Sequence, residues 1–154
     1  MTRATKKPRL SCHVVLLDES WSKALPGVER LVRKAARAAA RRGKSLNVAL
    51  ADDKVVRALN ARDRKKDKPT NVLSYPSGER AFLGDIVLAR QTVWREARVQ
   101  KKSPADHVAH LVVHGVLHLL GHDHETGDAD AERMEALERR ILARLGIADP
   151  YVAR

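Results

Sequence analysis

The sequence predicts an α/β (α+β) fold, a single domain with a small mixed four-stranded sheet packed with about five helices. Short apolar runs of strand length alternate along the chain with longer stretches of helical spacing. The chain has 154 residues, of which 44% are hydrophobic, so a single domain with one core is the simplest arrangement. Residues 1–9 are expected to form a basic flexible tail, and residues 10–154 the domain.

Four apolar runs predict the strands, and they cover residues 13–17, 46–50, 72–75 and 86–88. The turn signal Pro76-Ser-Gly78 separates the last two. Five stretches of helical spacing predict the helices, and they cover residues 26–42, 52–59, 90–101, 103–120 and 128–145.

The first two helices begin with residues that favour helix starts. Pro26 fits the first turn of the first helix, and Gly43 is placed to end it. Asp52 and Asp53 open the second helix at its positive end, where carboxylates are favourable. Residues 62–68 then form a predicted charged loop.

The last three helices are predicted from their spacing and from their ends. The stretch 90–101 turns its apolar side chains to one side. The next helix has the strongest start, with Ser103 as its N-cap and Pro104 at its first position, and Gly121 is expected to stop it. The helix over 128–145 has an acidic first turn and a basic last turn, which suits the helix dipole.

Positive charge is concentrated in the first half of the chain. Residues 1–70 hold 19 Lys+Arg against 7 Asp+Glu, a net +12, and residues 71–154 hold 11 against 12, a net −1. A basic protein of this size favours a polyanionic partner, nucleic acid first. The first helix carries a basic stripe that is either a solvated face or a phosphate-tracking face. The stripe consists of Arg30, Arg33, Lys34, Arg37 and Arg41.

Cys12 is the only cysteine, so no disulfide can form within the chain, which suits a reducing compartment. No apolar run has the length of a signal peptide's apolar region or of a membrane helix. We therefore expect a cytoplasmic protein with no membrane partner.

Six of the seven histidines lie between residues 107 and 124. Four of them fall within an arc of about 80° on a helix of about 100° per residue. The other residues of this helix are almost all apolar, so the stripe is expected to face the interior or a cleft, where imidazoles need partners. The stripe consists of His107, His110, His114 and His118.

His114, His118 and His124 follow the pattern H-x3-H-x5-H and are the predicted metal ligands. The first two lie one turn apart on one face, and Gly121 lets the chain turn so that His124 can return over that face. Three nitrogen ligands suit Zn²⁺ or another late divalent metal, and they leave one coordination position for water.

The remaining residues of the cluster leave alternatives open. His107 and His110 are expected to support the ligands or line the cleft rather than bind the metal, whereas His122 is a candidate fourth ligand. A zinc peptidase of the H-E-x-x-H type carries a glutamate beside its first histidine, but Gly115 stands there, so that base is missing. The alternative for the whole cluster is a set of core histidines bonded to backbone and carboxylates.

The segment from His114 to His124 resembles the signature of the YbeY family of bacterial metal-dependent endoribonucleases, with His122 where a tyrosine is usual. The similarity covers about residues 45–151, with Asp63 where an aromatic is common. Further blocks match in order: Leu59-Asn60, Arg64, Asp67-Lys-Pro-Thr-Asn-Val-Leu-Ser-Tyr-Pro76, Gly84-Asp-Ile-Val87, Ala109-His110, Met134-Glu-Ala-Leu-Glu138 and Asp149-Pro-Tyr151.

The resemblance implies one zinc ion on His114, His118 and His124, with Arg64 and His114 as catalytic residues. It implies hydrolysis of phosphodiester bonds in single-stranded RNA, in maturation of the 3′ end of small-subunit ribosomal RNA and in ribosome quality control. It also implies ribosomal RNA and the small ribosomal subunit as partners, together with ribosomal proteins or an assembly GTPase.

Two other functions stay open at this point. A non-catalytic assembly factor would bind ribosomal RNA with its basic half and use a structural zinc, but three ligands without a standard fourth argue against a closed site. A metallohydrolase acting on a small or peptide substrate is disfavoured by Gly115 and by the net charge of +11. The nucleophile of an RNA reaction is also open between water and a ribose 2′-hydroxyl.

Overall fold

The structure is a computed structural model, and it describes residues 7–65, 70–122 and 127–152. Residues 1–6 of the predicted basic tail and residues 66–68 of the predicted charged loop lie outside the described residues. In the described part of the chain, no helix is both long and apolar enough to cross a membrane.

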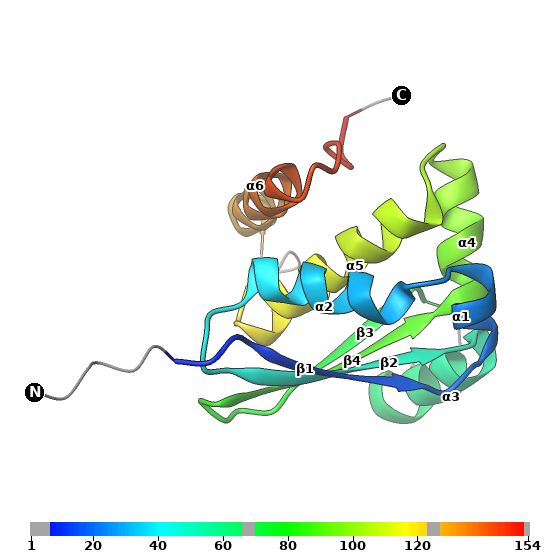
Figure 1. The fold of residues 1–154 in the computed structure, drawn as a ribbon, viewed down its shortest axis with the longest axis horizontal. Helices are drawn as coiled ribbons and strands as arrows, with labels where there is room; N and C mark the ends of the chain where they lie inside the picture. The colour runs from blue at the N-terminus through cyan, green and yellow to red at the C-terminus, as the bar shows by residue number, and fades with distance from the viewer. Residues whose placement is uncertain (1–6, 66–69, 123–126, 153–154) are drawn as a thin grey trace, which may run out of the picture.

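Four strands form one mixed sheet in the order β1-β2-β4-β3 (Figure 1). They are β1 (Ser11–Leu16), β2 (Ser45–Ala51), β3 (Val72–Pro76) and β4 (Phe82–Ala89). The strands β1, β2 and β4 are parallel, whereas β3 pairs antiparallel with β4, to which a short turn joins it. The predicted mixed four-stranded sheet is confirmed. β4 begins earlier than its predicted apolar run, because Gly84 interrupts the apolar pattern without ending the strand.

The described residues form six helices, against about five predicted. They are α1 (Ser20–Ala24), α2 (Val28–Ala39), α3 (Asp53–Arg64), α4 (Arg90–Val99), α5 (Pro104–Leu119) and α6 (Asp128–Arg144). The additional helix, α1, has five residues, which is too short for apolar spacing to reveal. Its Trp21 is fully buried and donates from Nε1 to the carbonyl of Ala51 (2.7 Å), so α1 is tied to the end of β2.

Two helices differ from their predicted bounds. α2 begins at Val28 rather than at Pro26, because Gly27 adopts a left-handed backbone (φ 81°) at the N-cap. It ends at Ala39, since the next residue is already extended (φ −121°, ψ 154°).

α3 continues to Arg64, so the first part of the predicted charged loop is helical. The arginines at this end of α3 favour a helix, and no glycine or proline interrupts it there.

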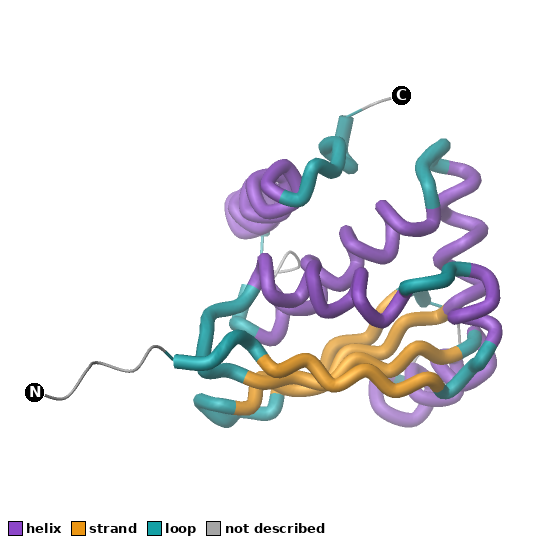
Figure 2. Tube along the Cα trace, in the orientation of Figure 1, coloured by secondary structure: helices purple, strands orange, loops and turns teal. Residues whose placement is uncertain are grey.

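The sheet separates two layers of helices (Figure 2). α2 and α5 pack on one face, α3 packs on the other, and α6 packs on α5 on the side away from the sheet. In β2, Leu46, Val48 and Leu50 belong to the main core under α2 and α5, while Ala49 faces the smaller core under α3. This alternation follows the two-residue period of a strand, and it leaves α5 buried in the middle of the molecule.

Position 84 on β4 requires a glycine, both because of its backbone conformation and because the neighbouring strand lies close to it. Its φ is 136°, and a Cβ atom there would lie 2.1 Å from the carbonyl oxygen of Tyr75 on β3. We expect Gly84→Ala to reduce the free energy of unfolding by about 3 kcal/mol or more, because backbone strain and overpacking add. Urea unfolding measures this loss.

Gly78→Ala is the matched control for Gly84→Ala. Gly78 also has a positive φ, 78°, but a Cβ atom there would meet nothing within 4 Å. Its cost should be limited to left-handed strain, about 1–2 kcal/mol. Equal losses in the two variants would show that the contact with Tyr75 is unimportant.

Candidate metal centre on helix α5

The ends of α5 follow the local signals of the sequence. The Ser103 hydroxyl accepts a hydrogen bond from the backbone N–H of Asp106 (3.1 Å), which confirms the predicted N-cap. At the other end, the N–H groups of Gly121 and His122 donate back to the last turn (both 3.0 Å), with Gly121 at φ 99°. This is the Schellman arrangement, and it turns the chain directly after the histidines.

Four histidines form one stripe along α5, as predicted. From His107 to His118, consecutive ring centroids lie 6.1, 6.3 and 4.8 Å apart. The shortest of these separations joins His114 and His118, the two predicted metal ligands of the described chain. The two imidazoles are therefore close enough for both to reach a single ion.

Glu138 of α6 holds His114 in one orientation. Its side chain is completely buried, and its Oε1 accepts a hydrogen bond from His114 Nδ1 (2.6 Å). Burial alone would raise the pKa of Glu138, but hydrogen bonds from His110, His114 and Tyr151 outweigh it and lower that pKa to about 2. A carboxylate at this place makes Nδ1 the protonated nitrogen of His114, so Nε2 is the atom suited to bind a metal.

Tyr151 brings the C-terminal segment onto the same carboxylate. Its hydroxyl donates to Glu138 Oε2 and lies 3.2 Å from His110 Nε2. Burial, followed by the hydrogen bond to Glu138, raises the pKa of the Tyr151 hydroxyl. Arg139 lies over the Tyr151 ring (5.3 Å to its centroid) and pairs with Asp149 (3.0 Å), which anchors this segment to α6.

His107 at the start of the stripe has a different partner. Its side chain is 2% exposed, and its Nε2 lies 2.8 Å from Glu96 of α4. Glu96 also accepts from the amide of Asn71 (2.9 Å). Burial would raise the pKa of Glu96, but these hydrogen bonds from His107 and Asn71 lower it. The contact agrees with the expected supporting role of His107 rather than with metal binding.

Position 115 faces the sheet and not the histidine stripe. A Cβ atom on Gly115 would lie 3.0 Å from Ile86 Cδ1 and 3.2 Å from the Ser74 hydroxyl. A glutamate there would have to displace β3 or β4 and would point away from His114. Packing therefore explains why the general base of an H-E-x-x-H peptidase is absent from this helix.

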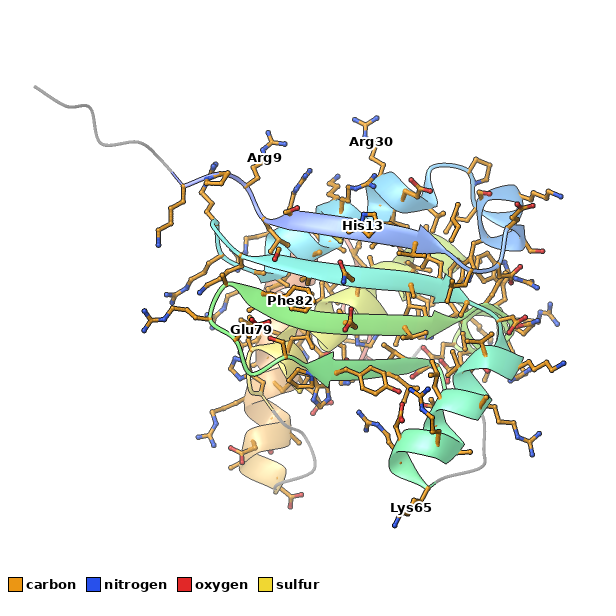
Figure 3. All side chains as sticks on the ribbon, turned by 90° about the horizontal axis from the view of Figure 1, so that it is seen from below. Arg9, His13, Arg30, Lys65, Glu79 and Phe82 are labelled. Carbon is orange, nitrogen blue, oxygen red and sulfur yellow. The ribbon has the colours of Figure 1, made fainter. Side chains whose placement is uncertain are left out.

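Arg64 is brought to the strand against which α5 packs. It stands at the end of α3, and its Nη2 donates to the carbonyl of Ser74 on β3 (3.0 Å). Ser74 is also the polar neighbour of Gly115, so Arg64 of α3 and Gly115 of α5 both lie close to this residue of β3. Figure 3 shows the end of α3, marked by Lys65, extending past the β3 edge of the sheet.

The third predicted ligand, His124, lies outside the described residues, as does Asp123. Among the residues that the structure describes, no three His, Cys, Asp or Glu side chains are grouped closely enough to hold a metal ion. His114 and His118 are the two predicted ligands that the structure describes. His122 is described and closes the turn after α5 with its backbone.

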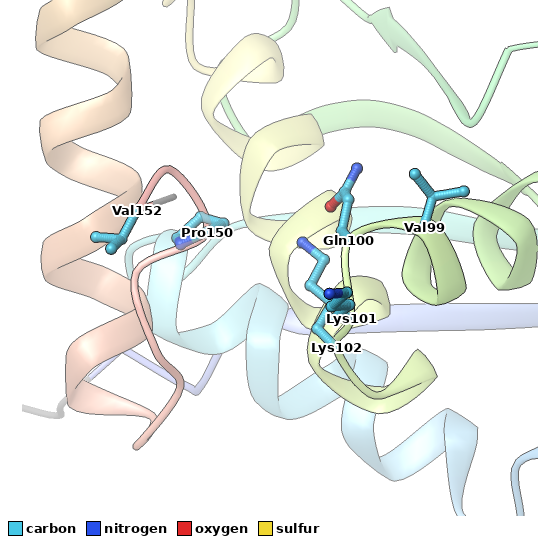
Figure 4. Close-up of a pocket in the computed structure, with 6 residues that line it drawn as sticks. All are labelled: Val99, Gln100, Lys101, Lys102, Pro150 and Val152. Carbon is cyan, nitrogen blue, oxygen red and sulfur yellow. The ribbon is translucent and has the colours of Figure 1, made fainter. Parts of the chain in front are cut away.

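A cavity of about 220 Å³ lies beside the stripe, between the α4–α5 loop and the C-terminal segment (Figure 4). It is bordered by Val99, Gln100, Lys101, Lys102, Pro150 and Val152. The amino group of Lys102 lies 3.5 Å from His110 Nδ1, so one residue that borders the cavity also contacts the middle of the histidine stripe.

Sequence reasoning assigned no role to Glu138 or Tyr151, although both stand in blocks that resemble the family. One signal was present for Glu138, because it shares the buried face of α6 with Met134, Ile141 and Leu142. A carboxylate on an apolar face needs a partner, and the histidine stripe of α5 is the partner that the structure supplies.

The comparisons with known protein sequences all identify the same family. The family model described as Endoribonuclease YbeY matches residues 17–146. A relative named Endoribonuclease YbeY from Azorhizobium caulinodans is 50% identical over 151 residues, which cover 90% of this chain and 94% of the relative. Another of that name, from Chelativorans sp., is 53% identical over 133 residues, which cover 79% and 81% of the two chains.

A solved structure shares the fold. The solution structure of TM1509 from Thermotoga maritima superposes with a TM-score of 0.58 at 24% identity, covering 88% of this chain and 91% of that one. The family model spans β2, β3, β4, α5 and Glu138, and the two relatives match 90% and 79% of this chain. The chain therefore belongs to the YbeY family of endoribonucleases.

Proposed function

We propose that the protein is a zinc-dependent endoribonuclease that cleaves single-stranded RNA. The observation that carries the proposal is His114, held at Nδ1 by the buried Glu138 (2.6 Å) with its ring 4.8 Å from that of His118. Relatives over most of the chain are named Endoribonuclease YbeY. The net charge of +11 favours a polyanionic substrate.

His114, His118 and His124 would hold the metal. The described part of this set fits zinc, since metal-binding imidazoles usually donate their other N–H to a carboxylate, as His114 does to Glu138. When bound, a divalent ion with an open position supplies positive charge to phosphate oxygens and lowers the pKa of water.

Arg64 would bind the phosphate that is cleaved. A guanidinium presents a planar set of donors that matches two phosphate oxygens, and it stays charged at all relevant pH values. The bond to the Ser74 carbonyl restrains the side chain beside β3 while the residue stays exposed to solvent. In this role, the guanidinium would orient RNA and stabilise the charge that develops during cleavage.

In the cell, this activity would serve maturation of the 3′ end of small-subunit ribosomal RNA and ribosome quality control in the cytoplasm. Membership of the family supports this role. Ribosomal RNA, the small ribosomal subunit, ribosomal proteins and an assembly GTPase are the partners that it would require.

Glu138→Gln is expected to weaken zinc binding about 10- to 100-fold, because the variant removes the negative charge that orients His114 and makes it more basic. Competition with a fluorescent chelator measures the affinity. Glu132→Gln is the matched control, since Glu132 is exposed on the same helix. Equal zinc affinities in the two variants would contradict the role given to Glu138.

The proposed function is tested by incubating purified protein of measured metal content with a labelled single-stranded RNA. We expect cleavage with zinc, loss of cleavage after chelation, and recovery when zinc returns. Protein that is full of metal and binds the RNA, yet leaves it intact, would contradict the proposal. Cyclic phosphate ends on the products would identify the ribose 2′-hydroxyl as the nucleophile.

A further inference from the structure

A second cavity, of about 240 Å³, lies at the β1 edge of the sheet, where α2 ends and β1 begins. Three arginines border it together with two aliphatic side chains: Arg9, Arg37, Arg42, Leu10 and Ala40. None of these residues belongs to the histidine stripe or to the surroundings of Arg64.

Two of the arginines are held in place by the backbone. Arg37 donates from Nε to the carbonyl of Leu10 (3.2 Å), and Arg42 donates from Nη1 to the carbonyl of Lys7 (3.5 Å). The bond of Arg37 to Leu10 uses Nε, and Arg37 borders the cavity. Anchored guanidinium groups lose little conformational entropy when they bind a ligand.

The charge of this cavity is not compensated within the described chain. Other arginines have carboxylate partners, such as Arg33 with Glu29 (3.9 Å) and Arg90 with Asp18 (2.6 Å). No carboxylate of the described residues lies within ion-pairing distance of the three arginines that border the cavity. Three like charges around one space repel each other unless an anion joins them.

We propose that this cavity binds a backbone phosphate of the RNA substrate at a distance from the cleaved bond. The inference rests on the proposed function. Guanidinium groups bind phosphate through paired hydrogen bonds, and the shape of the cavity provides room for one such group. The site is therefore an anchor for RNA and does not take part in the chemistry.

The position of the cavity predicts which RNAs use it. Figure 3 shows Arg9 and Arg30 projecting from the β1 edge of the sheet, while Lys65 extends past the opposite edge. Three spacings between neighbouring strands separate β1 from β3, about 14 Å across the sheet. Lys44, whose amino group donates to the backbone carbonyl of Arg80 (2.6 Å), and Arg80 itself add cations at the same end of the sheet, between the two edges. Only an RNA long enough to cross this distance can reach both sites.

The test compares a double variant, Arg9→Gln with Arg42→Gln, with a charge-matched control, Lys23→Gln with Arg98→Gln. Arg37 is kept because it supports the backbone of Leu10, directly before β1. The control residues are exposed on α1 and α4, at the opposite end of the parallel strands. Binding of a long single-stranded RNA and of a short oligonucleotide is measured over a range of salt concentrations, after thermal unfolding has shown that all proteins are folded.

We expect the test variant to lose affinity for the long RNA by roughly tenfold for each arginine, with a smaller loss for the short oligonucleotide. The slope of log affinity against log salt should fall by about 0.7 in magnitude, since the cavity holds one phosphate and each phosphate contact contributes about 0.7 on a single strand. The control should retain most of the affinity.

Equal losses of RNA affinity in the test and control variants would overturn the anchor. The proposed function would not be affected by that result, provided that the wild type cleaves RNA. Absence of cleavage by metal-loaded wild type would instead contradict the proposed function. Inorganic phosphate is tested alone to identify the source of the anion. Phosphate that stabilises the wild type but not the variant, with RNA affinity unchanged, would assign the cavity to a free anion and overturn the RNA anchor.

Discussion

His114→Ala is expected to abolish stoichiometric zinc binding and to slow RNA cleavage by at least about a thousandfold. The variant removes one of the predicted ligands and also the donor to Glu138 Oε1. A catalytic metal contributes several kcal/mol of charge stabilisation, and each ~1.4 kcal/mol changes a rate tenfold. Metal analysis and single-turnover cleavage of a labelled RNA measure the two effects.

Loss of the His114 hydrogen bond also leaves Glu138 buried with fewer donors, which costs about 1–3 kcal/mol of stability. His118→Ala separates this effect from metal loss, because it should abolish cleavage equally without removing a hydrogen bond from Glu138. His13→Ala is the matched control, since His13 is exposed on β1 outside the stripe. Cleavage by His114→Ala at the wild-type rate would point to a contaminating nuclease or to a site elsewhere.

Local signals explain why α5 could be predicted well. Its N-cap, its first-turn proline and its glycine stop all act within a few residues, so the sequence alone locates the helix and the stripe. The bounds of α2 were predicted less well, because proline and glycine, here Pro26 and Gly43, favour turns as well as helix ends. There, the left-handed Gly27 and the early extension at Ala40 decided the ends.

The contacts that orient the site could not be predicted from spacing. His114 and Glu138 are 24 residues apart, and His110 and Tyr151 are 41 apart, so each contact depends on how α6 and the C-terminal segment dock on α5. The same holds for Arg64, whose bond to Ser74 joins α3 to the edge strand β3. Periodicity reports which face of an element is apolar, but it does not report which element covers that face.

Arg64→Ala is expected to keep the fold and the bound metal and to slow cleavage about 100- to 1,000-fold. Loss of one charged donor aimed at the reacting group has effects of this size in enzymes that stabilise developing negative charge. Arg64 is exposed and makes one described hydrogen bond, to the Ser74 carbonyl, so truncation should cost little stability. Single-turnover rates and zinc content, measured on the same preparation, separate catalysis from metal binding.

Arg62→Ala is the matched control for Arg64→Ala, because Arg62 carries the same charge two residues earlier on α3 but pairs with Asp63 (2.6 Å). It should change cleavage by less than about threefold, as expected for an exposed ion pair. Since Arg64 is bonded to the Ser74 carbonyl and Arg62 is paired with Asp63, a difference between the variants reports position rather than net charge. Equal rates for Arg64→Ala and wild type would remove Arg64 from the site and leave phosphate binding to other cations.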